Sequence, residues 1–388
     1  MNVVFLSPHF PAHYYHFCRQ LKNCGATVLG IAEAPFTQLT ESLRESLTEY
    51  YRVDDMHNYD ELVRALGYYT HRYGKLDRLD SLNEYWLETE ARLRDDFNIF
   101  GIRSDSIHGI RRKSAMKEKF RAAGVPVAAG QVAANIAEAR AFIAEVGYPV
   151  VAKPDAGVGA LNTFRLNSDT DLLQFFATKP DVPYIFEAFI KGDIYSFDGL
   201  TDRNGEIVFH TSHVFSQGIM ETVNEGRHVS YYSLREVPPE LEALGRSCVR
   251  TFNVHERFFH IEFFQTSPGH YVALEVNMRP PGGYTTDMFN YACDIDIYRM
   301  WAELLVDGFC RTPFTRKYHC CYASRKKEHR YRFSHQQILA EYGPFIVQTA
   351  HVPGIFSSAL GDIGYIFRSP HLEDIRTITT FIQAIEAS

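Results

Sequence analysis

The chain has 388 residues, of which 45% are hydrophobic and 22% charged, and its formal net charge is -7. This length allows two to three domains with sizeable cores, and the composition is that of an ordinary soluble globular protein. The negative charge and the lack of a long basic run argue against a nucleic-acid-binding surface. No apolar run reaches roughly 18 residues and no signal peptide is recognisable, so we expect no membrane association.

Seven cysteines are present, which is an odd number, and none of them forms a C-x-x-C pair. This pattern fits neither a disulfide framework nor a zinc site. We therefore expect reduced, mostly buried thiols and a cytoplasmic location.

The N-terminal part alternates predicted strands and helices. Strands are expected at residues 2–6, 27–31 and 77–81, and helices at 12–23 and 83–96. A β-α-β start predicts a doubly wound, Rossmann-like layer. The G-x-G-x-x-G pattern is absent, so no dinucleotide is implied.

The middle of the chain predicts a small α+β unit followed by a longer, strand-rich region. In the small unit, helices are expected at 114–123, 136–146 and 169–177 and strands at 149–153, 163–166 and 184–188. A meander at 193–209 and helices at 239–253 and 292–306 follow. The C-terminal part predicts strands at 319–324, 345–351 and 364–368 and a helix at 372–387.

The most informative segment is 257–283, which reads as a β-hairpin. Residues 257–265 and 271–278 are rich in aromatic and β-branched side chains, and Ser267-Pro268-Gly269 between them is typical of a turn.

This hairpin brings polar side chains together. Folding at the turn places Glu262 opposite Glu275, and alternation along the strand puts Glu275, Asn277 and Arg279 on one face. Two carboxylates so close repel each other unless a cation lies between them, and hard oxygen ligands suit Mg²⁺ or Mn²⁺. An adjacent arginine suits a phosphate or carboxylate. A solvated polar face is the alternative that the hairpin alone leaves open.

Two lysines are candidates for phosphate binding. Lys153 ends a predicted apolar strand and precedes a loop of small residues, where Gly157 and Gly159 would let backbone N–H groups approach an anion. Lys113 stands at the head of the helix predicted at 114–123. Without the P-loop pattern, a plain strand-end lysine and a solvated helix start remain alternatives.

Taken together, these segments resemble the ATP-grasp superfamily, and within it carboxylate–amine ligases such as the L-amino-acid ligases and the ligase of pyrrolysine synthesis. The resemblance runs from about residue 2 to 310 and is stronger from 107. The segments that carry it are Lys113 before a short helix, G-Y-P-V-V-A-K-P at 147–154, F-E-A-F-I-K-G at 186–192, Glu262, and L-E-V-N-M-R-P-P-G-G at 274–283.

The resemblance implies an α/β fold class with three parts. These are a Rossmann-like domain at 1–106, an ATP-grasp domain at 107–311 with a lid subdomain at about 114–186, and a small α+β region at 312–388.

The resemblance also implies roles for particular residues. Residues 155–161 would close over the ATP phosphates, and 187–190 would form the hinge strand beside adenine. The implied ATP contacts are Lys113, Lys153, Gly157, Gly159, Glu187, Phe189, Ile190 and Asp193. Glu262, Glu275 and Asn277 would hold Mg²⁺, and Arg279 would be the catalytic residue that stabilises an acyl phosphate. In this family an acidic residue usually binds the ribose where this chain has Ile194, with Asp193 one position earlier.

The implied activity is an ATP-dependent ligation of a small carboxylic acid or amino acid to an amine, through an acyl phosphate, with release of ADP and phosphate. The expected partners are these small molecules, and a homodimer is considered. The polar segment 214–232 is either a specificity element or a plain surface loop.

The sequence leaves two other functions open. The pair His260 and Glu262, with His329 as a distal ligand, resembles the facial triad of an iron oxygenase, although that chemistry usually lies in an all-β jelly roll. A nucleotide-binding sensor or subunit without turnover is the other alternative, and the altered ribose position is its only support.

Overall fold

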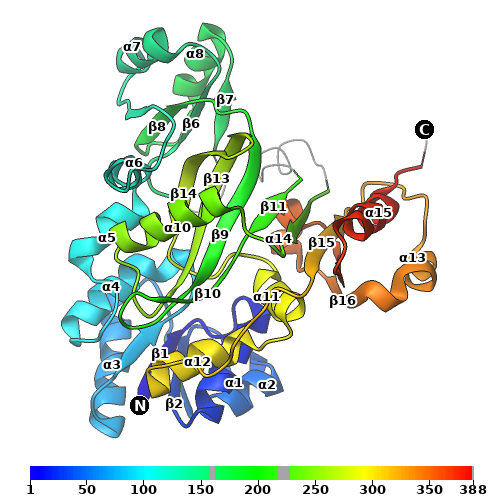
Figure 1. Ribbon diagram of the computed structural model, residues 1–388. Helices are drawn as coiled ribbons and strands as arrows, with labels where there is room; N and C mark the ends of the chain where they lie inside the picture. The colour runs from blue at the N-terminus through cyan, green and yellow to red at the C-terminus, as the bar shows by residue number, and fades with distance from the viewer. Residues whose placement is uncertain (158–161, 217–227, 387–388) are drawn as a thin grey trace.

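A computed structural model describes residues 1–157, 162–216 and 228–386, which form three sheets surrounded by helices (Figure 1). Gly159 and most of the segment 214–232 lie outside the described residues. The described ends of that segment are strands, because His213–Phe215 pairs with Ser230–Ser233. The expectation of one long loop is therefore wrong at both ends.

The N-terminal part is a parallel sheet in the order β3-β2-β1-β4. Val3 and Phe5 pack into one core and Val4 and Leu6 into another, so β1 is buried on both faces, as a parallel sheet between helices requires. Its strands are β1 (Asn2–Leu6), β2 (Thr27–Ala32), β3 (Glu49–Arg52) and β4 (Arg78–Asp80). Its helices are α1 (Tyr15–Asn23), α2 (Glu41–Ser46), α3 (Tyr59–Tyr73), α4 (Leu87–Asp96) and α5 (Ser104–Arg111).

The segment that the sequence predicts as a lid, which we call the lid below, contains a separate four-stranded antiparallel sheet in the order β5-β8-β6-β7, at the top of Figure 1. Asn135 and Ser168 cap its two helices, which pack on the sheet through Phe142 and Phe175. Its strands are β5 (Gly130–Val132), β6 (Val150–Pro154), β7 (Phe164–Leu166) and β8 (Tyr184–Ala188). Its helices are α7 (Ile136–Val146) and α8 (Asp169–Thr178), and α6 (Lys113–Ala122) precedes them.

The largest sheet has nine strands in the order β14-β13-β9-β11-β12-β15-β17-β16, with β10 paired to β9. Its strands are β9 (Asp193–Thr201), β10 (Ile207–Thr211), β11 (His213–Phe215), β12 (Ser230–Ser233), β13 (Phe258–Ser267), β14 (His270–Asn277), β15 (His319–Arg325), β16 (Ile346–His351) and β17 (Ile363–Ser369). The remaining helices are α10 (Pro239–Thr251), α11 (Thr285–Cys293), α12 (Ile297–Asp307), α13 (His335–Tyr342), α14 (Gly354–Leu360) and α15 (Leu372–Gln383). Because β12 pairs with β15, the sheet continues across residue 312.

Both connections of the lid lie against the hairpin β13–β14. On one side Val127 forms a parallel bridge with Ala273 of β14. On the other side β9 begins at Asp193, which pairs with Gln265 of β13. Gly192 is required there, since a Cβ atom would lie 2.5 Å from the carbonyl oxygen of Gln265.

Buried charges join the N-terminal part to the large sheet. Arg257 directly precedes β13, and its guanidinium lies 2.7 Å from Asp80 Oδ2 and 3.4 Å from Glu90 Oε2 in the N-terminal part. The Arg94 guanidinium, also in the N-terminal part, lies 2.7 Å from Glu90 Oε2. All four residues are at most 8% exposed. Two carboxylates against two guanidinium groups give a neutral cluster, which is how buried charges are tolerated.

Some expected elements differ from the structure. The helix expected at 292–306 is two helices, because Asp294 adopts a left-handed φ of 52° and Asp296 caps α12. The last helix ends at Gln383 rather than 387.

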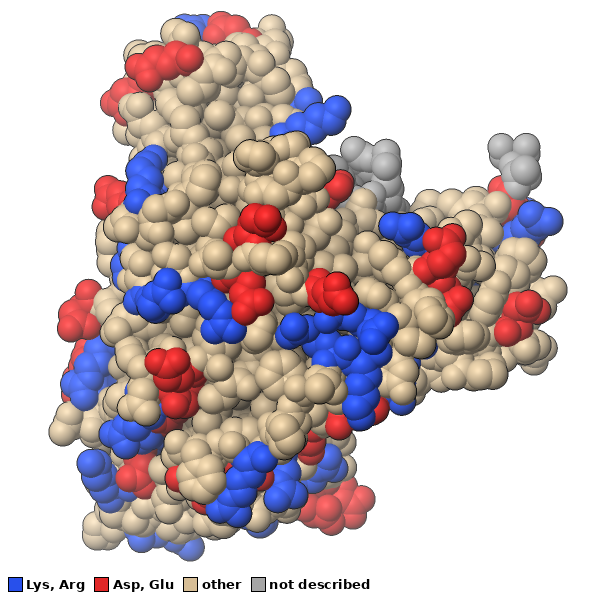
Figure 2. Space-filling model, viewed as in Figure 1, with Lys and Arg blue, Asp and Glu red and all other residues tan. Residues whose placement is uncertain are grey.

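None of the helices in the described parts has the length and hydropathy needed to span a membrane. Acidic and basic side chains are interspersed over the face in Figure 2.

Candidate active site

The hairpin forms one wall of the site. Glu262 lies directly opposite Glu275, and His260 opposite Asn277, as the sequence predicts for the carboxylate pair. Phe259, Ile261 and Phe263 point to the opposite face and are fully buried in the core beneath it. The alternation of the strand therefore separates polar residues on the cavity side from apolar residues on the core side.

The two facing carboxylates have opposite pKa shifts. Burial raises the pKa of Glu275, the charge of Glu262 adds to this effect, and Lys113 opposes it. Burial also acts to raise the pKa of Glu262, but the hydrogen bond and charge of His260 and the charge of Arg279 lower it overall. Lys113 Nζ is 4.0 Å from Glu275 Oε2. The pair thus holds excess negative charge that a cation would relieve.

Behind Glu262 lies a buried relay that the sequence did not predict. Asp198 of β9 is fully buried and accepts hydrogen bonds from His260 Nδ1 at 2.5 Å, His213 Nδ1 at 2.7 Å and Ser196 Oγ at 2.6 Å. The other ring nitrogen of His260 is 3.6 Å from Glu262 Oε1. Burial opposes protonation, yet Asp198 raises the pKa of His260 to about 9. A cationic imidazole is thereby held between two carboxylates.

The two predicted lysines lie on the opposite side of the same cavity. Lys153 is on β6 and Lys113 is the first residue of α6, and both side chains are at most 7% exposed. Lys153 Nζ is 2.9 Å from Glu187 Oε2, and Lys117 Nζ is 3.0 Å from Glu187 Oε1. Lys117 was missed, although its i+4 spacing from Lys113 places it one turn further along α6.

Glu187 is consequently held between two ammonium groups. Burial acts to raise its pKa, but Lys153 and Lys117 lower it overall. Its carboxylate therefore orients both ammonium groups and offsets one of their two positive charges, so this group of three side chains stays positive.

The start of the loop after β6 is anchored. Asp155, which is 3% exposed, accepts hydrogen bonds from the backbone N–H of Ser114 at 2.8 Å and from its hydroxyl at 3.0 Å. Its carbonyl accepts from the N–H of Lys113 at 2.8 Å. Gly157 follows this anchor, and the carbonyl of Gly157 is 3.5 Å from Lys113 Nζ.

The segment after β8 passes along the cavity. Phe189, Ile190, Asp193 and Ile194 all line it, and the Arg165 guanidinium lies 4.2 Å from the centre of the Phe189 ring. Asp193 is exposed at the first position of β9. This places a carboxylate at the rim beside Ile194.

Arg279 follows directly after the hairpin. It donates to the carbonyl of Pro280 at 2.8 Å and to Asn277 Oδ1 at 3.4 Å, and its Nε is 3.9 Å from Glu84 Oε2. Glu84, from a 3-10 turn in the N-terminal part, also binds Arg111 at 2.8 Å and is 4% exposed. Sequence reasoning missed Glu84, because nothing local to residue 84 indicates a partner at 279.

These groups share one cavity of about 640 Å³. Its lining includes Lys113, Lys153, Glu187, Phe189, Ile190, Asp193, Glu262, Glu275, Asn277 and Arg279. It also reaches the C-terminal part, where Phe356, Ala359 and Leu360 of α14 contribute. The volume lies in the range that suits a small-molecule ligand.

The iron hypothesis finds no support in the described residues. Both nitrogens of His260 face carboxylates, and His329 lies beside His228 and Tyr331 instead. In the described parts the residues close enough to form a three-ligand group are Glu33, Asp55 and His57, which are exposed in the N-terminal part.

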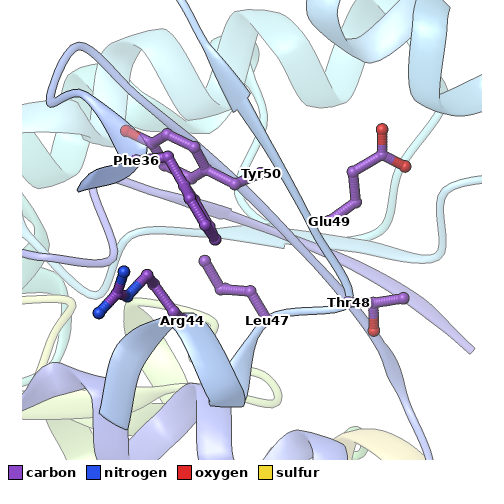
Figure 3. A pocket seen from close by; sticks show the side chains of 6 residues that line it. All are labelled: Phe36, Arg44, Leu47, Thr48, Glu49 and Tyr50. Carbon is purple, nitrogen blue, oxygen red and sulfur yellow. The ribbon is translucent and has the colours of Figure 1, made fainter. Parts of the chain in front are cut away.

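A second, smaller cavity of about 330 Å³ lies in the N-terminal part, beside α2 and β3 (Figure 3). Its polar side chains have other partners: Glu49 accepts from Tyr73, Tyr68 and Arg72, and the Tyr50 hydroxyl donates to Ala34. The Phe36 and Tyr50 rings, whose centroids are 6.0 Å apart, form part of its wall. It contains no group suited to catalysis.

Comparisons with known proteins support an ATP-grasp assignment for the fold. No protein-family model matches the chain. The L-arginine-specific L-amino acid ligase of Bacillus subtilis is 25% identical over 272 residues, which is 68% of this chain and 65% of the relative. The uncharacterized protein y4rH of Sinorhizobium fredii is 27% identical over 68% of this chain and 55% of its own length. The chain therefore spans less than two thirds of either relative.

Solved structures agree in fold. An L-amino acid ligase from Bacillus licheniformis has a TM-score of 0.75 at 12% identity and covers 100% of this chain and 98% of its own. An N5-carboxyaminoimidazole synthetase from Staphylococcus aureus, complexed with ADP, has a TM-score of 0.72 at 13% identity and covers 97% and 95%. The resemblance predicted from the sequence is confirmed at the level of fold, which is mixed α/β with ATP-grasp neighbours.

Proposed function

We propose that this chain, with its ATP-grasp fold, is an ATP-dependent carboxylate–amine ligase that forms an amide bond through an acyl phosphate. The observation that carries the proposal is the single cavity in which Glu262, Glu275, Asn277 and Arg279 face the buried cations Lys113 and Lys153. Anionic metal ligands opposite cations are what a phosphoryl transfer requires. Two of the proteins named above are L-amino acid ligases, from Bacillus subtilis and Bacillus licheniformis, and they support an amino acid as a substrate.

The nucleotide fits the lid side of the cavity. In this proposal Lys113 and Lys153 hold the phosphates, with Gly157 beside Lys113. Glu187 keeps Lys153 charged and binds Lys117 through its other oxygen. Phe189 and Ile190 present backbone groups to adenine, and Asp193 accepts the ribose hydroxyls. A structural neighbour was solved with ADP, which supports a nucleotide as a ligand of this fold.

The proposed domains are a Rossmann-like domain at 1–106, an ATP-grasp domain at 107–311 with its lid at about 114–186, and a C-terminal region at 312–388. The parallel sheet β3-β2-β1-β4 supports the first of these.

The free thiols, most of them buried, support a cytoplasmic location for the reaction.

The donor set fits a magnesium ion. Glu262, Glu275 and Asn277 offer oxygen atoms only, and two facing carboxylates need a cation between them. When bound, the ion would neutralise charge on the phosphate oxygens. Lys113 shares that task from the other side of the cavity, 4.0 Å from Glu275.

The chain's own residues account for the two chemical steps. A carboxylate oxygen of the acid attacks the γ-phosphorus of ATP, the bond to the β-phosphate oxygen breaks, and ADP leaves. The amine nitrogen then attacks the acyl carbon, phosphate leaves with the bonding electrons, and the leaving phosphate takes up the proton that the amine loses. Arg279 binds the oxygens on which charge develops, and Asn277 and Glu84 hold its guanidinium. Closure of the lid excludes water that would hydrolyse the acyl phosphate.

The nucleotide product tests this proposal. With an amino acid and an amine present, we expect ADP and phosphate by chromatography of the spent nucleotide. AMP and pyrophosphate would reject it, because they require attack at the α-phosphorus. Binding of ATP without any product, over a panel of acids and amines, would favour a sensor.

A further inference from the structure

The cavity has a second end that the nucleotide and metal residues do not account for. It begins at Gly282 and Gly283, directly after Arg279, and extends to the C-terminal part. We refer to this region as the apolar end, and define it by Phe215, Val229, Tyr231, Phe356, Ala359 and Leu360. None of these described residues carries a formal charge at pH 7, whereas the opposite end contains Lys113, Lys153 and Glu187.

The aromatic rings of the apolar end are held in place. Phe215 stacks on Tyr231 with ring centroids 5.2 Å apart, and Phe10 stacks on Phe356 at 5.2 Å. The hydroxyl of Tyr231 is 3.1 Å from Thr285 Oγ1, so the one polar atom of that ring already has a partner. Ser216 and Thr285 also line the cavity nearby, and their hydroxyls have partners in Ser230 and Gly282. The six residues of the apolar end therefore present mainly aromatic and aliphatic carbon to the cavity.

Helix α14 closes this end from the C-terminal part. The hydroxyl of Tyr322 donates to the carbonyl of Leu360 at 2.7 Å, which fixes the end of the helix. Gly283 has a φ of +66°, and a Cβ atom there would lie 3.2 Å from the Tyr231 hydroxyl and 3.3 Å from a methyl of Leu360. Gly283 thus lets the backbone after Arg279 approach Tyr231 and Leu360 closely, and all four residues line the same cavity.

We propose that the apolar end is the side-chain subsite of the acid substrate, and that it selects an amino acid with an uncharged aliphatic or aromatic side chain. This inference rests on the proposed function, because it takes Arg279 as the group beside the reacting carboxyl. An acid substrate whose carboxyl is bound there can extend its side chain either toward Lys113 and Lys153 or past Gly283. ATP would occupy the space beside the two lysines, so the side chain would extend past Gly283.

The physical basis of selection is burial. Each methylene transferred from water to such a surface increases affinity about fourfold. An ammonium, guanidinium or carboxylate placed there would lose its hydration without gaining a partner among the described residues. We therefore expect leucine, methionine and phenylalanine to be better acid substrates than lysine, arginine and aspartate, with kcat/KM higher by at least tenfold.

Trapping with hydroxylamine isolates the acid site. Hydroxylamine replaces the amine, attacks the acyl phosphate and yields a hydroxamate and phosphate, so its formation reports the acid alone. We expect kcat/KM for leucine, methionine and phenylalanine to exceed that for lysine, arginine and aspartate by at least tenfold. A smaller ratio, or a preference for a charged acid, overturns the inference while the proposed function stands.

Variants on one helix provide a matched pair. Phe356→Asp introduces a carboxylate into the apolar end and should lower the leucine-to-lysine ratio of kcat/KM at least tenfold. Ile355→Asp adds the same charge at a neighbouring residue that is 73% exposed and should change the ratio less than twofold. Equal effects of the two variants would contradict a role for α14.

Binding separates the inference from the proposed function. If no acid yields hydroxamate or ADP, the proposed function fails. Calorimetry with leucine and lysine, on protein saturated with Mg²⁺ and a non-hydrolysable ATP analogue, then decides the inference by itself. Tighter binding of leucine by tenfold or more supports it, and any smaller difference overturns it.

Discussion

Asp198 binds the imidazole of His260 from one side, at 2.5 Å, while the other nitrogen of the same ring faces the carboxylate of Glu262 at 3.6 Å. The aspartate is fully buried and is also bound by His213. A rigid, charged support of this kind would fix the orientation of Glu262, the carboxylate that we propose as a metal ligand, as groups that contact metal ligands commonly do.

We expect His260→Ala to raise the Mg²⁺ concentration required for half-maximal activity by about 10-fold to 100-fold, because Glu262 loses its support. The measurement is ADP release over a magnesium titration. His270→Ala, an exposed histidine on the same hairpin, is the control and should leave the requirement unchanged. An unchanged requirement in His260→Ala would show that the relay only stabilises the fold.

Glu275→Gln removes one of the two facing charges at nearly constant volume. We expect a loss of at least about 10²-fold in kcat with a normal unfolding midpoint, because the metal site loses an anionic ligand. Glu118→Gln, an exposed position on α6, should have full activity. Wild-type turnover in Glu275→Gln would reject the metal assignment.

Lys153→Ala should weaken ATP binding by at least about tenfold, since a buried ammonium next to phosphate supplies charge that water replaces poorly. Lys191→Ala, an exposed lysine at the rim of the same cavity, should change the affinity by less than about threefold. Calorimetry with ATP measures both, and equal affinities would remove the role of Lys153.

Protonation of the buried His13 should lower the free energy of unfolding in acid. Burial lowers the pKa of His13 to about 4, from 6.5 in the unfolded chain. The unfolded state therefore binds more protons between these values, and stability falls as the pH decreases from about 6.5 to 4, by at most ~3 kcal/mol. His13→Phe, which can still stack on Tyr284, should lose less stability over this range in urea titrations. The exposed His71→Gln should behave like the wild type.

Arg257 supports the contact between the N-terminal part and the large sheet. Arg257→Met leaves Asp80 and Glu90 with one guanidinium, and we expect a loss of about 3–5 kcal/mol in the free energy of unfolding. Arg250→Met, at the exposed end of α10, should cost less than about 0.5 kcal/mol. A loss below about 1 kcal/mol for Arg257→Met would show that solvent reaches the cluster.

The sequence predicted those parts of the site that depend on local pattern. The turn at Pro268-Gly269 pairs Ser267 with His270, and counting back from there pairs Glu262 with Glu275. The structure has two register shifts along the hairpin, which the sequence did not predict, and the pairing holds because they cancel. Lys113 and Lys153 could be located because each begins or ends a recognisable element. The cavity brings these elements together, although the assignment of ligands and nucleotide contacts stays a prediction.

Features that depend on long-range contacts were missed. Asp198 meets His260 across 62 positions, and Glu84 meets Arg279 across a still longer stretch of chain, so no spacing rule could pair them. Helix α14 is seven residues long and follows a proline, which made it inconspicuous. The break between α11 and α12 was hidden because apolar residues continue on both sides of Asp294.

The attachment of the lid determines how it can move. Its two covalent connections both lie along the metal-binding hairpin, one through the bridge of Val127 to Ala273 and the other through the pairing of Asp193 with Gln265. A rotation of the lid as one body would pivot at these two contacts. Such a rotation would move Lys153, which lies on β6 of the lid, relative to Glu262 and Glu275, which lie on the hairpin. The same hairpin would therefore carry the proposed metal ligands and the points about which the lid pivots.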